Sequence, residues 1–198
     1  MWDERYGSDD YAYGVEPNDF LVNSLRGDTS GRALSIADGE GRNGVWLAKQ
    51  GLEVHTFDGS RVGVTKALRL ALSNKVTIDA VVDDMRTYEI APASFDVVVS
   101  IFAHTDADTR RDLHRRVVRG LRPGGVVILE AYSPRQLSFG TGGPKDESLL
   151  VTTEMLRDEF AGLEIEHLAE VERDVVEGSL HTGTASVVQL IARRPKGQ

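Results

Sequence analysis

Short apolar runs alternate with longer stretches of helical periodicity along the first two thirds of this chain. Such alternation is typical of parallel strands joined by crossover helices. It predicts five parallel strands, at residues 33–36, 53–57, 78–82, 95–100 and 126–130. Two later extended runs, 163–171 and 185–192, have no helix between them, so they must pair antiparallel. The expected fold class is α/β: a Rossmann-like seven-stranded sheet of five parallel strands plus a C-terminal antiparallel pair, with helices on both faces.

All 198 residues are expected to form a single domain, because single cores commonly reach about 100–200 residues. Residues 1–30 are predicted to form an N-terminal lid and a helix that starts near Pro17 and ends at Gly27. Residues 133–150 are rich in Gly, Pro and Ser, which predicts a substrate loop at the edge of the site. Thr152 or Thr153 is expected to cap the helix that follows.

Composition excludes several classes of function. The 31 acidic and 23 basic residues give a net charge of −8, which disfavours a nucleic-acid partner. No apolar run approaches the roughly 20 residues of a transmembrane helix, and the N-terminus is too polar for a secretory signal. We therefore expect no membrane partner and a cytoplasmic location. With no cysteine, the chain has no disulfide, thiolate metal site or cysteine nucleophile, and we expect no metal.

A glycine-rich turn between the first strand and the next helix is the first sign of a ligand. It contains the pattern GxGxxG in Gly39, Gly41 and Gly44, and glycine lets the backbone approach a ligand closely. Asp58 ends the second strand 58 − 39 = 19 positions after Gly39, close to the roughly 20 expected for an acid that binds a ribose. S-adenosylmethionine and NAD both present a ribose diol, so this pattern leaves both cofactors open.

Two further motifs follow in order along the chain. Asp83-Asp84-Met85 comes after the third strand, and the segment LRPGG at 121–125 precedes the fifth. Together with the antiparallel ending, this set resembles the class I S-adenosylmethionine-dependent methyltransferases over nearly the whole chain. The segments WDERY (2–6), YGVEPN (13–18) and GEGRN (39–43) further resemble the small bacterial tellurite-resistance and thiol methyltransferase group. The resemblance implies an enzyme that moves a methyl group from S-adenosylmethionine to a small-molecule acceptor.

The resemblance also implies which residues hold the cofactor. The glycine turn would bind its methionine part, Asp58 its ribose, the acidic site after the third strand its adenine, and the end of the fourth strand would lie beneath the sulfonium. The implied cofactor residues are Ala37, Asp38, Gly39, Glu40, Gly41, Asn43, Asp58, Gly59, Ser60, Asp84, Met85, Ser100, Ile101 and Phe102. The turn departs from the family pattern, with Ser35 for an acid and Ala37 for a glycine. We expect Asp38 to compensate by accepting the cofactor's ammonium.

Methyl transfer from a sulfonium needs mainly positioning of donor and acceptor, so a general base is optional. The catalytic candidates are Arg42 after the glycine turn, His104 after the fourth strand, and His181 in the late hairpin. In the resembling group a histidine at the hairpin faces the acceptor. The alternative is that Arg42 is a solvated arginine on the helix surface and that His104 and His181 are surface imidazoles. Trp2, Tyr13 and Tyr132 are candidate substrate contacts. Trp2 and Tyr13 are also candidates for a lid over the cofactor, since aromatic rings suit a sulfonium.

Other interpretations of the sequence stay open. Ala37 and Asp38 would also fit a module that binds S-adenosylmethionine without turnover, and an NAD-dependent reductase is a further alternative. Six arginines between residues 110 and 122 could suggest RNA binding, but their spacing opposite apolar positions favours a solvated helix face. The sequence gives no indication of the oligomeric state.

Overall fold

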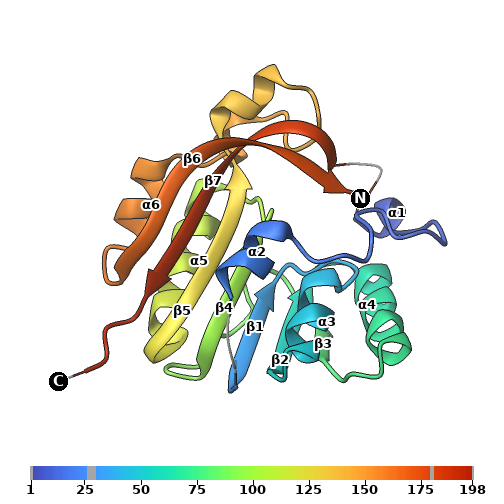
Figure 1. Ribbon diagram of the computed structural model, residues 1–198, viewed down its shortest axis with the longest axis horizontal. Coiled ribbons are helices and arrows are strands. Elements are labelled where there is room, and N and C mark those ends of the chain that lie inside the picture. The colour runs from blue at the N-terminus through green and yellow to red at the C-terminus, as the bar shows by residue number, and fades with distance from the viewer. Residues whose placement is uncertain (1, 26–29, 179–180, 198) are drawn as a thin grey trace.

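The computed structural model describes residues 2–25, 30–178 and 181–197, apart from the side chain of His181. Seven strands form one sheet in the order β3-β2-β1-β4-β5-β7-β6 (Figure 1). The strands are β1 Arg32–Ile36, β2 Glu53–Asp58, β3 Asp79–Val82, β4 Phe95–Ile101, β5 Leu121–Tyr132, β6 Glu164–Glu177 and β7 His181–Arg193. Strands β1 to β5 are parallel, whereas β7 runs antiparallel to both β5 and β6. The predicted fold class is confirmed.

Helices cover both faces of the sheet and enclose two cores (Figure 1). The α-helices are α1 Trp2–Arg5, α2 Asp19–Ser24, α3 Arg42–Lys49, α4 Arg61–Ser73, α5 Ala107–Gly120 and α6 Thr153–Glu159. Two 3-10 helices, η1 Pro134–Ser138 and η2 Glu147–Leu149, lie in the predicted substrate loop. Side chains of α2, α3 and α4 pack on one face, and those of α5 and α6 on the other. None of the helices among the described residues is long and apolar enough to cross a membrane.

Helix starts follow local capping chemistry. Ser60 accepts from the amide of Gly63 at the start of α4, and Thr152 accepts from that of Met155 at the start of α6. Thr152 was one of the two predicted caps. The predicted end of the first long helix, Gly27, lies outside the described residues.

The antiparallel hairpin is longer than predicted. Strands β6 and β7 pair from Glu164 opposite Arg193 to Glu177 opposite His181, well beyond the expected ends at Val171 and Ala185. The sequence predicts the connection at residues 177–183, which are mostly polar or small, and places residues 172–176 in neither strand. Arg173 and Glu177 are held within the strand by ion pairs, which a local pattern cannot reveal.

The arginines of α5 do not all lie on a solvated face, so that prediction was wrong for two of them. Arg110 is buried, and its Nε and Nη2 bind Oε1 of Glu159 on α6 at 3.0 and 2.9 Å. Arg116 donates to the backbone carbonyls of Met85 and Tyr88. Helical periodicity alone predicts that these charged side chains are exposed, because it contains no information about a carboxylate on another helix.

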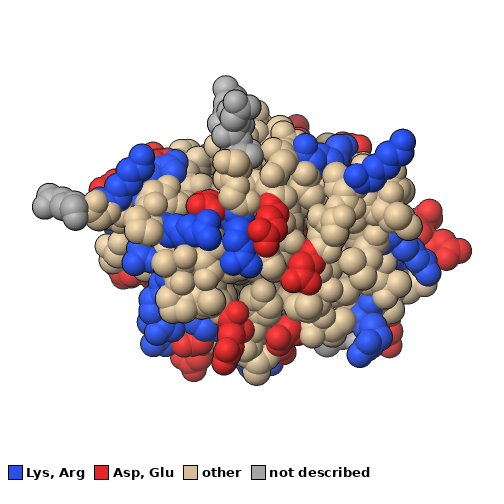
Figure 2. All heavy atoms as spheres, turned by 90° about the horizontal axis from the view of Figure 1, so that it is seen from below, with Lys and Arg blue, Asp and Glu red and all other residues tan. Residues whose placement is uncertain are grey.

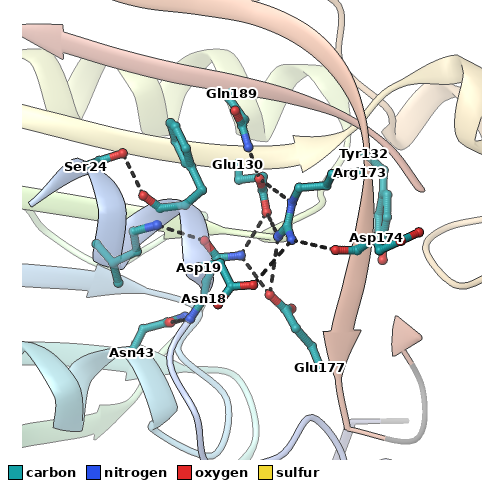
Figure 3. A network of polar contacts seen from close by, with 12 residues as sticks. Asn18, Asp19, Ser24, Asn43, Glu130, Tyr132, Arg173, Asp174, Glu177 and Gln189 are labelled. Carbon is teal, nitrogen blue, oxygen red and sulfur yellow. Dashed lines mark hydrogen bonds and ion pairs between the residues drawn. The ribbon is translucent and has the colours of Figure 1, made fainter. Parts of the chain in front are cut away.

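A buried carboxylate of β5 gathers donors from three other segments (Figure 3). Glu130 is fully buried, and its Oε1 accepts from Nδ2 of Asn18 at 2.8 Å. Arg173 of β6 binds both oxygens, at 2.5 and 3.1 Å, and Gln189 of β7 donates to Oε2 at 2.6 Å. The carboxylate therefore joins the N-terminal segment to the C-terminal hairpin.

A second buried carboxylate extends this network to the glycine turn. Nδ2 of Asn18 also donates to Oε1 of Glu177 at 2.7 Å, and Nη2 of Arg42 binds Oε2 of Glu177 at 2.5 Å. The Asn18 amide N–H donates to Oδ1 of Asn43 at 3.0 Å. We call Asn18, Arg42, Glu130, Arg173 and Glu177 the buried ion network. Its two carboxylates and two guanidinium groups balance in charge, as buried ions require.

Replacing Arg173 with methionine should cost about 3 kcal/mol of unfolding free energy, since Glu130 would keep its charge without a cation. The matched control is Arg135→Met, which breaks an exposed ion pair with Glu172 and should cost at most about 1 kcal/mol. Urea unfolding of both variants measures the difference. Equal losses in the two variants would show that the buried ion network does not stabilise the fold.

Candidate functional site

A cavity of about 720 Å³ opens at the carboxyl edge of the parallel strands, where open α/β sheets bind ligands. Its volume falls within the roughly 300–1,000 Å³ of small-molecule sites. The lining residues are Trp2, Arg5, Tyr6, Tyr13, Gly14, Ala37, Asp38, Gly39, Glu40, Arg42, Asn43, Phe57, Asp58, Gly59, Asp83, Asp84, Met85, Arg86, Ile101, Phe102, Ala103, His104, Thr105, Tyr132, Gly142, Gly143, Pro144, Lys145 and Leu149. Residues from five strand ends, the N-terminal segment and the substrate loop therefore meet in one place.

The glycine turn between β1 and α3 is tightly packed from behind. Gly39 and Gly41 have φ values of 58° and 91°, which favour glycine. A Cβ on Gly39 would lie 2.7 Å from the Tyr6 hydroxyl, and one on Gly41 would lie 2.6 Å from the Cβ of Ala67. Ala37 also has a left-handed conformation, with φ 48°, and such a residue costs about 1–2 kcal/mol. The turn thus keeps its shape despite the alanine, with strain at the cavity wall.

Asp58 connects the two loops that follow β1 and β2. Its Oδ2 accepts from the amide of Gly39 at 2.9 Å and its Oδ1 from the amide of Ser60 at 2.8 Å. Burial raises the pKa of this carboxyl, although both amides oppose the shift. A carboxylate has about four acceptor positions, so two remain for the hydroxyls of a ribose.

Asp38 fixes the start of α3 and faces the cavity. Its Oδ1 accepts from the Ser35 hydroxyl at 2.7 Å, and its Oδ2 accepts from the amide of Gly44 at 3.1 Å. Burial raises the pKa of Asp38 to about 7. Ser35, at the position where the family often has an acid, thus serves as a donor to the acid three residues later.

A buried ion pair lies beneath the turn and reaches the N-terminal segment. Nζ of Lys66 on α4 binds Oε1 of Glu40 at 2.8 Å and donates to the carbonyl of Asp10 at 2.7 Å. The backbone N–H of Tyr13 donates to Oε2 of Glu40 at 3.5 Å. Lys66 therefore links the segment before α2 to the glycine turn.

Aromatic rings of the N-terminal segment cover this end of the cavity. Tyr6 is buried, stacks on Trp2 at 5.7 Å and meets the edge of Tyr13 at 6.2 Å between ring centroids. Burial raises the pKa of Tyr6, and the charge of Asp58 adds to the shift. Asp3 accepts from the Ser60 hydroxyl, which anchors α1 beside the loop that follows β2. This arrangement encloses the cavity from the side of the predicted lid.

Three stacked rings form the opposite wall. Tyr132 lies 4.5 Å from Phe102 and 5.5 Å from His104 between ring centroids. Nδ1 of His104 lies 3.0 Å from the carbonyl of Leu149, which can only accept, and Nε2 lies 3.4 Å from the amide of Tyr132, which can only donate. These two contacts match a donor at Nδ1 and an acceptor at Nε2 of His104. To act as a base, Nε2 of His104 would have to give up its contact with the Tyr132 amide and contact the group that loses the proton.

Most of the predicted site residues line the cavity, but not all. Gly41, Ser60 and Ser100 are not among the lining residues. Arg42 lines the cavity while bound to Glu177. His181 begins β7, and its side chain lies outside the described part of the chain. The roles of these residues stay predictions.

Several residues of the site were missed by sequence reasoning. Arg5, Lys145 and Leu149 line the cavity, and nothing in their local sequence distinguishes them from surface residues. Glu130, which lies behind the cavity in the buried ion network, carried a usable signal, because it is the one charge in the apolar run from Val126 to Tyr132. A charge in such a position needs a buried partner. The identity of that partner, Arg173, was not accessible from the sequence.

Comparison with known proteins finds a family match in the central part of the chain. Residues 33–125 match the family model of the methyltransferase domain. The tRNA (uracil(54)-C(5))-methyltransferase of Pyrococcus horikoshii is 33% identical in an alignment of 102 positions, which covers 46% of this chain and 25% of that protein. The chain therefore spans about a quarter of the length of the curated relative it matches.

Solved structures share the fold at low sequence identity. A protein of echinomycin biosynthesis, studied for the conversion of a disulfide bond into a thioacetal group, has a TM-score of 0.76 and 20% identity, with 100% of this chain and 92% of that chain covered. TehB from Haemophilus influenzae has a TM-score of 0.74 and 14% identity, and the match covers 98% of this chain and 65% of TehB. A methyltransferase from Methanosarcina mazei, described as S-adenosylmethionine-dependent, has a TM-score of 0.67 and 17% identity. The match covers 92% of this chain and 100% of that chain.

The domain match and the fold agree with each other. Residues 33–125 match a methyltransferase domain, and the solved S-adenosylmethionine-dependent methyltransferase from Methanosarcina mazei has the same fold as this chain. The likeness to TehB extends to the fold, so a place in the tellurite-resistance group stays a prediction.

Replacing Asp38 with asparagine should change how stability depends on pH. The folded-state pKa of about 7 lies above the ordinary value of 3.8, so the folded state binds the proton more tightly. This stabilisation is complete below 3.8 and is lost as the pH rises to about 7. Between these values the parent should lose up to about 1.4 kcal/mol per pH unit relative to Asp38→Asn.

Urea unfolding of both proteins at several pH values from about 5 to 8 measures this difference. Above the folded-state pKa the two curves should run parallel. Parallel curves over the whole range would contradict the raised pKa of Asp38.

Proposed function

We propose that this protein transfers a methyl group from S-adenosylmethionine to a small-molecule acceptor. The observation that carries the proposal is the single cavity that joins the residues expected to hold the cofactor with an aromatic wall. The glycine turn and Asp58 lie at one end of the cavity lining, and Phe102, His104 and Tyr132 form the other wall. Donor and acceptor would then share one enclosed space, as direct transfer requires.

The residues at the first end fit the cofactor chemically. Asp58 would bind the ribose with its two remaining acceptor positions, and Asp38 would accept the ammonium. Asp84 and Met85 would meet the adenine, since both line the cavity after β3. When bound, S-adenosylmethionine supplies an activated methyl group on a sulfonium. Phe102 and Tyr13 would surround that cation with aromatic rings.

The protein's own contribution is positioning with little or no general base. His104 is engaged through both ring nitrogens, so it is suited to orienting the wall rather than to taking a proton at once. A thiolate, halide or chalcogen oxyanion needs little deprotonation, which favours such an acceptor. A sulfur acceptor would also match the sulfur chemistry of the echinomycin-biosynthesis protein, which was studied for the conversion of a disulfide bond into a thioacetal group.

A small acceptor is favoured over nucleic acid on grounds of charge. The relative from P. horikoshii is a tRNA methyltransferase by name, but this chain carries a net charge of −8. On the face shown in Figure 2, acidic and basic side chains are interspersed and do not gather into a basic surface. Such a surface would attract a polyanion only weakly.

We place the enzyme in the cytoplasm.

Calorimetry with S-adenosylmethionine, S-adenosylhomocysteine and NAD tests the cofactor. A panel of thiols, halides, oxyanions and phenols with labelled S-adenosylmethionine then tests transfer. Binding of NAD alone would overturn the proposal. A protein that binds S-adenosylmethionine but methylates none of the panel would instead fit a sensor module, which the unusual Ala37 and Asp38 would also allow.

Replacing Asp58 with asparagine should weaken binding of S-adenosylmethionine by about 1–3 kcal/mol, because a charged acceptor for hydroxyl groups is lost. Asparagine keeps one oxygen for the amides of Gly39 and Ser60, so it disturbs the loops less than alanine. Calorimetry gives the affinity, and thermal unfolding without cofactor gives the control. An unchanged affinity would mean that the ribose lies elsewhere.

Arg42 is proposed to orient an anionic acceptor, and its ion pair with Glu177 permits a discriminating test. The variant Arg42→Gln should lower both turnover and stability, because Glu177 loses its nearer cation and keeps only Arg173, at 3.6 Å. The double variant Arg42→Gln, Glu177→Gln restores the charge balance and should regain stability. If Arg42 acts on the acceptor, turnover stays low while cofactor affinity is unchanged. Recovery of turnover together with stability would assign Arg42 a structural role only.

A further inference from the structure

The charged side chains that line the cavity are divided between its two ends. All of the described acidic lining residues lie at or after the ends of β1, β2 and β3, the strands whose ends we assign to the cofactor; they are Asp38, Glu40, Asp58, Asp83 and Asp84. The described lining residues at or after the ends of β4 and β5, between Ile101 and Leu149, include no acidic side chain. The wall expected to meet the acceptor therefore does not repel an anion.

Two of the four cations in the cavity lining are neutralised by carboxylates. Nη2 of Arg42 binds Oε2 of Glu177 at 2.5 Å, inside the buried ion network. Arg86 lies between two loops, with Nη1 3.5 Å from Oδ2 of Asp84 and Nη2 3.6 Å from Oδ2 of Asp106. Neither guanidinium group therefore adds uncompensated positive charge to the cavity.

The other two cations, Arg5 and Lys145, have no acidic partner in the described part of the chain. Arg5 is engaged by its own segment, because its Nη1 donates to the Tyr13 hydroxyl at 2.9 Å and its Cζ lies 4.9 Å from the centroid of the Trp2 ring. The ammonium of Lys145 makes no hydrogen bond or ion pair with a described residue. Among the described lining residues, Lys145 thus has the charge most available to a ligand.

The substrate loop that carries Lys145 is fixed to the hairpin by a buried glutamine. Nε2 of Gln136 donates to the Thr141 hydroxyl at 3.0 Å and to the Gly142 carbonyl at 3.1 Å. Oε1 of Gln136 accepts from the amide of Ser186 on β7 at 2.9 Å. These three contacts hold the loop in place just before Lys145.

The neighbours of Lys145 place it beside the aromatic wall. A Cβ on Gly143 would lie 2.6 Å from Cδ2 of Tyr132, so the backbone of the loop packs directly against this ring. Asp146, the next acid along the loop, is directed elsewhere, since its Oδ1 accepts from the amide and the hydroxyl of Ser148 at 2.9 and 2.7 Å. Lys145 is therefore held near the wall without a carboxylate of its own loop.

We propose that Lys145 binds a carboxylate of the acceptor, which makes this enzyme specific for small acids. The inference rests on the proposed function and extends it, because it adds a second anionic group, at the substrate loop, to the methyl-accepting atom beside the sulfonium. An ammonium offers three donors and one positive charge, which suits the single charge of a carboxylate. A phosphate ester carries about −1.5 to −2 charges, which one lysine would leave partly unpaired.

Kinetics with two thiols of similar size test the assignment. Mercaptopropionate and mercaptoethanol differ mainly in carrying a carboxylate or a hydroxyl group. Lys145→Gln should lower kcat/KM for mercaptopropionate about tenfold, because a charge-assisted hydrogen bond is lost, and leave kcat/KM for mercaptoethanol unchanged. The loss should appear in KM rather than in kcat, since the carboxylate binds away from the reacting atom.

The matched control is Lys196→Gln, at an exposed lysine beside Gly124, near the amino end of β5 and outside the cavity lining. It should change neither value. An equal effect of Lys145→Gln on both thiols, or no effect on either, would overturn the assignment. A selective loss for mercaptopropionate in Arg5→Gln but not in Lys145→Gln would place the carboxylate at the N-terminal segment and would overturn it as well.

Binding to the complex with S-adenosylhomocysteine separates this inference from the proposed function. That complex holds no transferable methyl group, so both thiols bind without reacting, and ligand-observed NMR gives their dissociation constants. The parent should bind mercaptopropionate more tightly than mercaptoethanol, and Lys145→Gln should abolish the difference. This result without methyl transfer from S-adenosylmethionine would contradict the proposed function alone. Equal affinities in a parent that methylates both thiols would overturn only the role of Lys145.

Discussion

The buried ion network is the constraint on which the arrangement of the site depends. Glu130 and Glu177 lie inside the protein, where a charge without a partner would be very unfavourable. Their cations come from opposite ends of the chain, Arg42 at the glycine turn and Arg173 in the hairpin. The hairpin therefore cannot move from the sheet edge without exposing or isolating a charge. Because Asn18 binds both carboxylates, the N-terminal segment is held to the same centre.

Features set by neighbouring residues were predictable from the sequence. The glycine turn needs left-handed conformations at Gly39 and Gly41, and their spacing and position after an apolar strand indicate this directly. Asp58 ends a strand beside the turn, so parallel pairing of β1 and β2 alone brings it to the Gly39 amide. The antiparallel ending follows similarly, since two extended runs with no helix between them cannot pair parallel.

Features set by distant partners were not predictable. Asn18 and Glu177 are 159 positions apart, and neither residue type signals that it will be buried. The polar residues of β6 resemble a loop when their partners are unknown. For this reason the strand was predicted to end at Val171, whereas it extends to Glu177. Arg110 resembles a surface residue for the same reason, because its carboxylate belongs to another helix. Single-sequence patterns describe the chain's own periodicity, whereas burial of charge depends on which segments meet.

Two strained residues lie on the cavity wall, at the ends of neighbouring strands. Ala37 after β1 and Phe102 after β4 both have left-handed φ values, 48° and 54°, although neither is glycine. Such conformations persist only where the surrounding structure enforces them, and they are most frequent at functional sites. Asp38 is tied to Ser35 and Gly44 on one side, and Phe102 is held against Tyr132 on the other. The strain therefore falls at the junction of the proposed cofactor and acceptor regions, where a precisely shaped wall matters most for positioning the methyl group.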